Sequence, residues 1–265
     1  MRKIVKLTVF LLAVFGGAAF CNTAKAVDHT WPGAANPYTD NITLETGNNF
    51  TVTGITGTVS GDIDGDGSLV KLGDGTLVLS GDNTFTGGTV LSAGTIVLGC
   101  DTALGTWVAG DPAATQSGML SVIGGDGTIQ VLEDRTITNH FQLGTTADRK
   151  GSLRFDIASG KTLTITGVQN TATNDYLGRG GAINVNVYST DGTSSPLTFS
   201  GGNLVFSSNK SATRGGAVGA WFDDLKQHSV FDFRGLESVT FSGNIAGNTY
   251  GFGGGINFSS SSVTL

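Results

Sequence analysis

The chain has little cysteine, proline or charge. Two of its 265 residues are cysteine, four are proline and 14% are charged. So few prolines, among glycines that follow no three-residue period, exclude a collagen. A mean hydropathy of +0.09 is too apolar for simple disorder. The scarcity of Lys and Glu argues against a helical bundle, and the composition as a whole argues against a cytosolic α/β enzyme.

Glycine and β-branched residues are abundant instead. The chain has 42 glycines, more than twice the usual share of about 7%. Gly, Ser, Thr and Asn separate short runs of Val, Ile, Leu and Phe, which is typical of a turn-rich all-β protein.

Residues 1–26 have the pattern of a secretory signal peptide. Arg2, Lys3 and Lys6 precede the apolar stretch 7–20, and Ala24-Lys25-Ala26 is a small-x-small cleavage site. The apolar stretch is too short to span a bilayer comfortably, and no second run of about 18 apolar residues follows it. The sequence therefore predicts export through the Sec pathway. A lipoprotein anchored at Cys21 is the alternative, for which the preceding Phe20 is a poor fit.

Cleavage of this segment makes the chain more acidic. The segment holds four of the 15 basic residues and none of the 21 acidic ones, so the mature chain has a net charge of −10. Such a charge repels nucleic acid and anionic lipid surfaces. Cys100 is then the only cysteine, so an internal disulfide is impossible.

Two repeats follow a lead-in or cap over residues 27–60. In residues 61–170, Gly-Thr-apolar recurs at positions 75, 88 and 94, each time opening a run of strand-forming residues. Strands this short cannot bury a face alone, so they must stack on copies of themselves. The pattern predicts an all-β solenoid.

A second repeat occupies residues 171–265. Gly180-Gly181-Ala182-Ile183 returns at 215–218 and 253–256, and Phe206-x-x-Asn209 returns at 241–244. We expect each Phe to point inward, each Asn to lie at a corner in a hydrogen-bonded ladder, and each Gly pair to mark a close approach of neighbouring coils.

These motifs resemble two families of repeats. Residues 68–99 resemble the autotransporter-associated β-strand repeat, with Gly75-Thr76-Leu77, Ser80-Gly81, Asn83, Phe85 and Gly87-Gly88-Thr89 in its order. Residues 180–256 resemble the repeats of chlamydial-type polymorphic outer-membrane proteins, although Val218 and Gly255 depart from the Gly-Gly-Ala-Ile pattern. Both families are passenger domains of type V secretion. The resemblance implies a right-handed parallel β-helix at the outer membrane, on the cell surface or in the medium.

The expected function is that of a surface-displayed adhesin or structural protein with a role in virulence. The resemblance implies as partners a host-cell or matrix protein or glycan, and an outer-membrane β-barrel of the full-length protein. At about 20–24 residues per coil, the mature chain would form about ten to twelve coils. Because residues 259–265 run on as a strand without a polar cap, we expect a β-helix truncated at its C-terminus.

One motif suggests a metal. Asp62-x-Asp64-x-Asp66-Gly67 copies the start of a calcium loop, in which alternate carboxylates converge on one cation. The bidentate Glu of such a loop is replaced by Gly73. The alternative is an acidic turn. No other cofactor is indicated.

No catalytic motif is present, and the chain is not expected to be an enzyme. The alternative is a secreted carbohydrate-active β-helix enzyme, a polysaccharide lyase or hydrolase, which could gather distant charged residues in one groove. The candidates for such a groove are Arg154, Asp156, Lys161, Arg179 and Arg214.

Aromatic residues in irregular segments are the expected binding anchors. Trp107 and the Trp221-Phe222 pair are the candidates, because aromatics give a large contact area at a small entropic cost. The alternative is that these rings only cover coil edges.

Overall fold

The computed structural model describes residues 38–39, 41–45, 49–53, 57–108, 118–144, 151–173, 178–186, 197–221, 231–247 and 253–259. The predicted signal peptide, residues 1–26, lies outside the described residues. No membrane-crossing helix occurs among the residues described.

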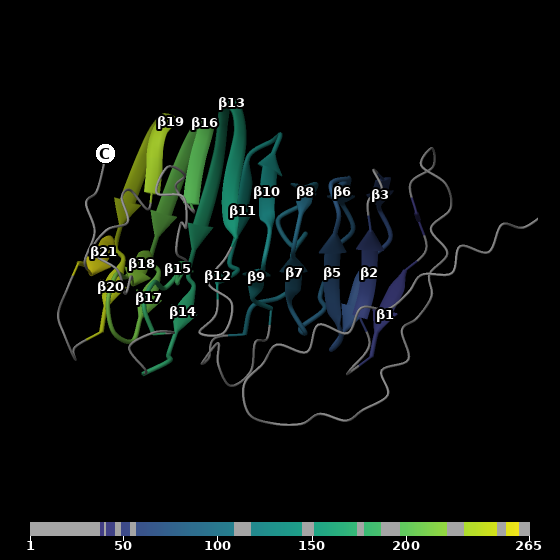
Figure 1. Ribbon diagram of the computed structural model, residues 1–265, viewed down its shortest axis with the longest axis horizontal. Coiled ribbons are helices and arrows are strands. Elements are labelled where there is room, and N and C mark those ends of the chain that lie inside the picture. Colours follow the sequence, from purple (N-terminus) through teal and green to yellow (C-terminus); the bar gives the residue numbers. More distant parts are fainter. Residues whose placement is uncertain are drawn as a thin grey trace, which may run out of the picture.

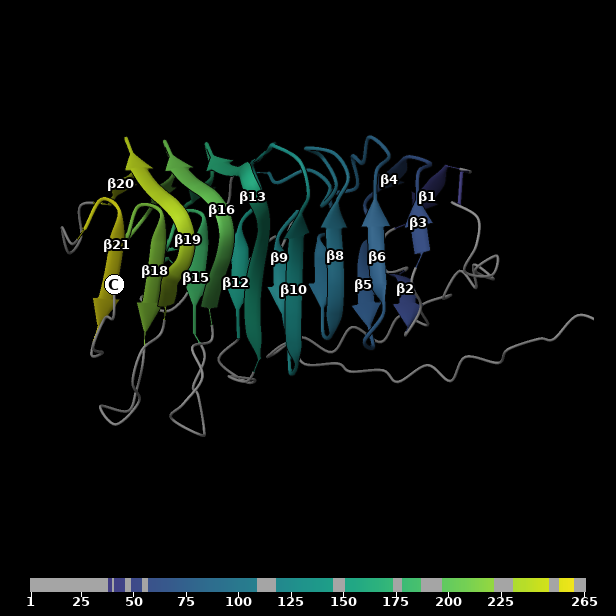
Figure 2. The same cartoon turned by 90° about the horizontal axis from the view of Figure 1, so that it is seen from above.

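The strands wind into a parallel β-helix, in which each turn of the chain is called a coil (Figure 1). Two eight-stranded sheets run the length of the stack, and the chain passes from one to the other and back in each coil. A two-stranded and a three-stranded sheet occupy parts of a third side. Seen from above, the strands follow one another along the long axis from β1 to β21 (Figure 2).

The first sheet contains β3 (Gly57–Val59), β6 (Thr76–Leu79), β8 (Gly94–Leu98), β10 (Asp126–Val131), β11 (Arg135–Ile137), β13 (Ser152–Thr166), β16 (Leu197–Ser207) and β19 (Phe231–Ser242). The second sheet contains β2 (Asn49–Thr53), β5 (Ser68–Leu72), β7 (Thr89–Leu91), β9 (Leu120–Val122), β12 (Phe141–Leu143), β15 (Ile183–Val185), β18 (Val218–Trp221) and β21 (Ile256–Ser259). The small sheets are formed by β1 (Ile42–Leu44) with β4 (Ile63–Gly65), and by β14 (Gln169–Asn170), β17 (Lys210–Ser211) and β20 (Ile245–Ala246).

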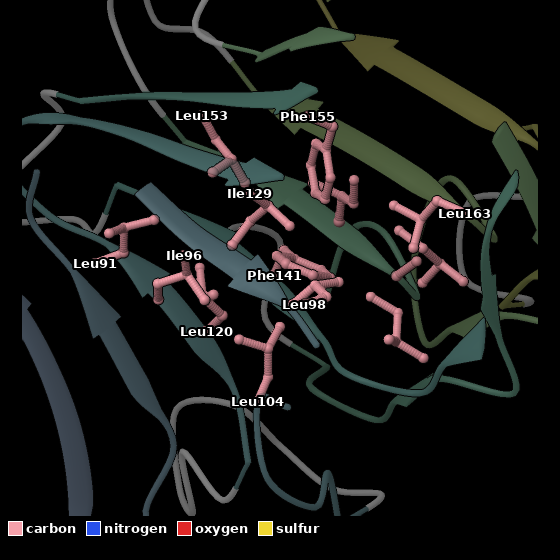
Figure 3. Packing of buried hydrophobic residues seen from close by; sticks show 14 of the residues in the cluster. Leu91, Ile96, Leu98, Leu104, Leu120, Ile129, Phe141, Leu153, Phe155 and Leu163 are labelled. Atoms are coloured by element: carbon pink, nitrogen blue, oxygen red, sulfur yellow. The ribbon is translucent and has the colours of Figure 1, made fainter. Parts of the chain in front are cut away.

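Alternation along the strands builds the core. In β6, Leu77 and Leu79 are fully buried while the residues between and before them are only partly covered. Because successive side chains of a strand point to opposite faces, every second residue enters the space between the sheets. Figure 3 shows these side chains meeting from the two sides, with Leu91, Leu120 and Phe141 on the second sheet and Ile96, Ile129 and Phe155 on the first.

The coils are fewer and longer than expected. Among the residues that the structure describes, the second sheet contains eight strands, against the ten to twelve coils that the sequence predicted for the whole mature chain. Leu69 pairs with Thr89 and Leu120 with Phe141, but Phe141 pairs with Ile183, 42 positions later. Long strands are one reason, because β13, β16 and β19 are 15, 11 and 12 residues long. The segments between strands are another, because Thr89 pairs with Leu120, 31 positions later, although β8 between them has only five residues.

The predicted glycine contacts are confirmed. A Cβ on Gly181 would lie 2.2 Å from the carbonyl oxygen of Gly216, and one on Gly216 would lie 2.2 Å from that of Gly254. The first glycine of each pair has a left-handed backbone conformation, with φ of +64° at both Gly180 and Gly215. Only glycine permits this spacing of coils.

The predicted inward position of Phe and the predicted asparagine ladder are also confirmed, and the Phe rings stack in addition. The rings of Phe206 and Phe241 stack at 5.2 Å with an angle of 11° between their planes. Asn209 Nδ2 donates to Asn244 Oδ1 over 3.0 Å, and Asn244 Nδ2 donates to the carbonyl of Phe206 over 2.9 Å. The Phe-x-x-Asn motif therefore joins each coil to the one before it.

Candidate functional site

The first repeat forms one and a half coils of the stack, from β5 through β8. Its Phe85 is fully buried, and Asn83 is 1% exposed although its side chain is polar. A Cβ on Gly81 would lie 2.2 Å from the carbonyl oxygen of Gly61, and one on Gly87 would lie 2.3 Å from that of Gly67. Gly81 and Gly87 of the motif thus stand where the chain makes close contacts with the preceding coil.

Asn83 joins three coils. The backbone N–H of Ile63 in the preceding coil donates to its Oδ1 over 2.9 Å. Its Nδ2 donates to the carbonyl of Ala103 in the following coil over 3.0 Å. A buried amide that satisfies backbone groups on both sides fixes the register of the stack, because a shift would leave those groups unpaired.

Lys71 is a buried cation that the sequence analysis did not single out. Its side chain is fully buried, and its Nζ donates to the carbonyls of Leu72, Gly73 and Ala93 at 3.1, 2.6 and 3.3 Å. Burial lowers the pKa of Lys71, and the nearby Asp74 carboxylate opposes that shift. The sequence contained a sign of this burial. Lys71 lies two positions after Leu69 in an alternating strand, so the two side chains point to the same, inward face.

The motif and its geometry correspond to a known repeat family. Residues 69–98 match the passenger-associated-transport-repeat. No curated protein and no solved structure matches this chain. The match covers the region that resembles the autotransporter-associated β-strand repeat, and it is consistent with the repeats of autotransporter passengers.

Outside the passenger-associated repeat, the proposed calcium ligands do not converge. Asp62, Asp64 and Asp66 are all exposed around β4. Asp62 Oδ1 accepts a hydrogen bond from the backbone N–H of Asp82 over 2.8 Å, so this carboxylate links two coils. Within the described part of the chain, no three His, Cys, Asp or Glu residues form a group that could hold a metal ion. The acidic turn is therefore the interpretation that the geometry supports.

Trp107 belongs to the core. It is 8% exposed, and its ring lies 5.2 Å from that of His140 at an angle of 32°. His140 is fully buried, its Nδ1 lies 2.8 Å from the carbonyl oxygen of Gly181, and desolvation lowers its pKa to about 4. The imidazole is therefore neutral near pH 7, with Nδ1 as the donor. Trp107 thus covers a coil, which was the alternative to its role as a binding anchor.

The other aromatic candidates are not placed. Trp221 is the last residue of β18, but its side chain is not described, and Phe222 lies outside the described residues. Where side chains are described, the exposed large apolar residues are aliphatic: Val108, Leu132, Val239 and Ile245.

Two of the charged candidates come together on the outer face of the first sheet. Arg154 donates to Asp156 Oδ1 over 3.1 Å and to Ser200 Oγ over 3.0 Å. Gln130 Nε2 donates to Asp156 Oδ2 over 3.3 Å. Partial burial raises the pKa of Asp156, but the hydrogen bonds from Gln130, Arg154 and Ser200 outweigh it, so the net shift is downward. This pair is a structural link between neighbouring strands.

The remaining charged candidates make separate contacts. Lys161 pairs with Glu133 at an exposed position. Arg179 is 1% exposed and donates to the carbonyl of Ala220 over 3.3 Å. Arg214 directly precedes the glycine pair at 215–216, as Arg179 precedes the pair at 180–181. The repeated Arg-Gly-Gly sequence could have indicated that both arginines have a structural role.

A row of buried polar residues lies on the outward face of the second sheet. Ser121, Gln142 and Asn184 are in register, and each alternates with core residues of its strand. Asn184 Nδ2 donates to Gln142 Oε1 over 3.0 Å, and Gln142 Nε2 donates to the carbonyl of Gly144 over 2.8 Å. Sequence analysis missed this row, because alternation alone assigns its members to solvent.

Proposed function

We propose that this chain is the passenger region of an exported, surface-displayed autotransporter-like protein, and that it acts as an adhesin. The observation that carries the proposal is the passenger-associated repeat at residues 69–98, set within a parallel β-helix. The residues of its motif hold neighbouring coils together. The repeat therefore has a structural role, and we assign contacts with a partner to the outer faces of the β-helix.

The outer face of the first sheet is suited to weak, repeated contacts. Thr76, Thr95 and Thr128 are in register on neighbouring strands and alternate with buried core residues, so they form a row on the outer face, here called the threonine row. Hydroxyl groups in such a row offer many hydrogen bonds and no deep pocket. Each contact is weak in water, and many copies on one cell would supply avidity.

Host-cell or matrix proteins, or surface glycans, are the partners that we propose for this face. The mature chain's excess of acidic residues favours neutral or basic surfaces over nucleic acid. The full-length protein would reach the surface through its own outer-membrane β-barrel.

The test measures attachment. Beads coated with the mature chain are incubated with host cells, matrix proteins and a glycan array, and Thr95→Glu/Thr128→Glu is compared with Thr43→Glu, an exposed threonine that alternates with core residues in β1, outside the first sheet. We expect the chain to bind at least one surface, the double variant to lose most of that attachment, and the control to retain it. Attachment to none of the surfaces, or new reducing ends released from a polysaccharide panel, would overturn the proposal.

A further inference from the structure

A groove lies on the outer side of the three-stranded sheet. It has a volume of about 220 Å³, and the described residues that line it are Gln169, Asn170, Thr171, Lys210 and Ala212. They belong to the neighbouring strands β14 and β17 or directly follow them (Figure 1). We call these five residues the β14–β17 groove.

The buried residues of the two strands serve the fold. Asn170 Nδ2 donates to the carbonyl of Gly180 over 3.1 Å, and Asn170 Oδ1 accepts the backbone N–H of Ala172 over 3.1 Å. Ser211 Oγ donates to the carbonyl of Arg214 over 3.0 Å. Asn170 therefore forms a wall of the groove, while its amide holds the backbone in place.

The outward residues offer their polar groups to the groove. Gln169 and Lys210 are partners in the parallel register, and both are exposed, as is Thr171. Among the described residues, the amide of Gln169, the hydroxyl of Thr171 and the ammonium of Lys210 have no hydrogen-bond partner. An amide, a hydroxyl and a cation thus line one space, next to the methyl group of Ala212.

Lys210 differs in this respect from the other cations. Every other lysine or arginine in the described part of the chain interacts with a group of the protein, either a carboxylate, as Arg154, Lys161 and Arg234 do, or a backbone carbonyl or another partner. None of the described residues that line the groove is acidic. An unpaired ammonium in such a groove favours a ligand with a negative charge.

The charge and volume limit which anion fits. The excess of acidic residues in the mature chain repels polyanions, such as a heavily sulfated glycan, more than a ligand with one carboxylate. The volume is below the about 300–1,000 Å³ of sites that enclose a drug-sized molecule, so the groove has room for one small ring. A uronic acid combines a carboxylate for Lys210, hydroxyls for Gln169 and Thr171, and a C–H face for Ala212.

We propose that the β14–β17 groove binds one uronic acid residue of a host glycan, with Lys210 as the contact to its carboxylate. The proposal rests on the proposed function, because it names a ligand of the adhesin, but it concerns a different sheet from the threonine row. An exposed ion pair is weak, so we expect a dissociation constant on the order of 1 mM for a single sugar, and avidity on a cell.

The test compares two sugars that differ in one group. Methyl glucuronide carries a carboxylate where methyl glucoside carries a hydroxymethyl group, and each is titrated into the mature chain by ligand-observed NMR. We expect the glucuronide to bind at least tenfold more tightly than the glucoside. Lys210→Gln should weaken glucuronide binding about tenfold, and Ala212→Leu should weaken it by filling the groove while the charge remains.

Two variants serve as controls for these changes. Lys161→Gln removes the same charge from an exposed lysine that pairs with Glu133 on the first sheet, and it should bind the glucuronide as the wild type does. Thr95→Glu/Thr128→Glu should also retain glucuronide binding, because the threonine row lies on another sheet.

Equal binding of the two sugars, or glucuronide binding that Lys210→Gln leaves unchanged, would overturn the proposal. If N-acetylglutamate amide binds as tightly as the glucuronide, the groove recognises acidic peptides and the assignment to a glycan is wrong. The bead assay separates this proposal from the proposed function. Attachment of coated beads without glucuronide binding would overturn the groove alone, whereas glucuronide binding without attachment to any surface would overturn the adhesin function and leave the groove as a sugar site.

Discussion

Two regions of the β-helix, residues 57–108 and residues 151–247, enclose the same kind of core but fill it with different side chains. In the earlier region the strands have three to five residues, and Leu, Ile and Val make up most of the core, with Phe85 and Trp107 as its buried rings. In the later region β13, β16 and β19 have 11 to 15 residues, and columns of Phe rings fill it. A longer perimeter encloses a wider interior, and native packing density then requires larger side chains.

The two regions also satisfy their buried polar groups differently. In the earlier region, single residues serve single sites: Lys71 binds turn carbonyls and Asn83 joins its two neighbouring coils. In the later region, Asn209 and Asn244 bind each other in a continuing ladder. Local solutions allow each short coil to differ from the next, whereas a ladder requires the same residue in every coil.

The largest difference between the regions should come from truncating the core. Phe206→Ala removes a fully buried ring from a stack and should cost about 4 kcal/mol of the free energy of unfolding, against about 3 kcal/mol for Leu79→Ala in the earlier region. Urea denaturation of both variants measures this. A smaller loss for Phe206→Ala than for Leu79→Ala would contradict the role given to the ring columns.

His140, which lies between the two regions, should make stability depend on pH. Its pKa is lowered to about 4 in the fold, whereas an unfolded chain has a value near 6.5. Between these values the unfolded chain binds the extra proton, so stability falls as the pH drops from about 6.5 to about 4, by about 3 kcal/mol. His140→Gln should remove this slope from denaturation midpoints measured across the window. An unchanged slope would assign the effect to other groups.

The asparagines should differ in coupling. Asn209→Ala and Asn83→Ala should each cost about 2 kcal/mol, because each leaves buried backbone groups unpaired. Combined with Asn244→Ala, Asn209→Ala should show a coupling free energy of about 1 kcal/mol, since the two amides bind directly. Asn83→Ala combined with Asn244→Ala is the control and should be additive. If the losses in the free energy of unfolding are additive in both double variants, the two asparagines of the ladder stabilise the fold independently of each other.

Replacing the buried lysine should have the smallest effect. Lys71→Leu copies Leu91, which pairs with Lys71 in the next coil, so the apolar part of the side chain is retained. The variant loses the bonds from Nζ to the carbonyls of Leu72, Gly73 and Ala93, and we expect a loss of about 1–2 kcal/mol. A more stable variant would show that burial of the ammonium costs more than these bonds return.

The sequence predicted what is periodic in this molecule. The inward Phe206 and Phe241, the corner Asn209 and Asn244, and the close approach at Gly181 and Gly216 all follow from residues that recur at equivalent positions. A residue that recurs at equivalent positions indicates a contact between coils, because such a contact needs one residue from each of the two coils.

What occurs once was harder to predict. Trp107 sits in an aperiodic segment, where nothing in the sequence distinguishes a buried ring from an exposed one, and the structure places it against His140. The coil number was overestimated because the coils after the first repeat use more chain per turn, and β13, with 15 residues, spans the width that β10 and β11 share in the preceding coil. The strand is interrupted between β10 and β11 in one coil and is continuous as β13 in the next. This difference appears only when the two coils are compared, so neither segment of sequence shows it alone.

The direction of the hydrogen bonds sets how the rod would respond to force. In both eight-stranded sheets the bonds join one coil to the next, so they point along the axis while the strands lie across it. Tension along the axis would load the coils in series and open them one at a time, as a zipper opens, beginning where the ladders are narrowest. In the second sheet these are β7, β9, β12 and β15, with three residues each. Drag across the rod would instead shear every bond of a ladder at once, so the same molecule would be compliant lengthwise and stiff against sideways flow.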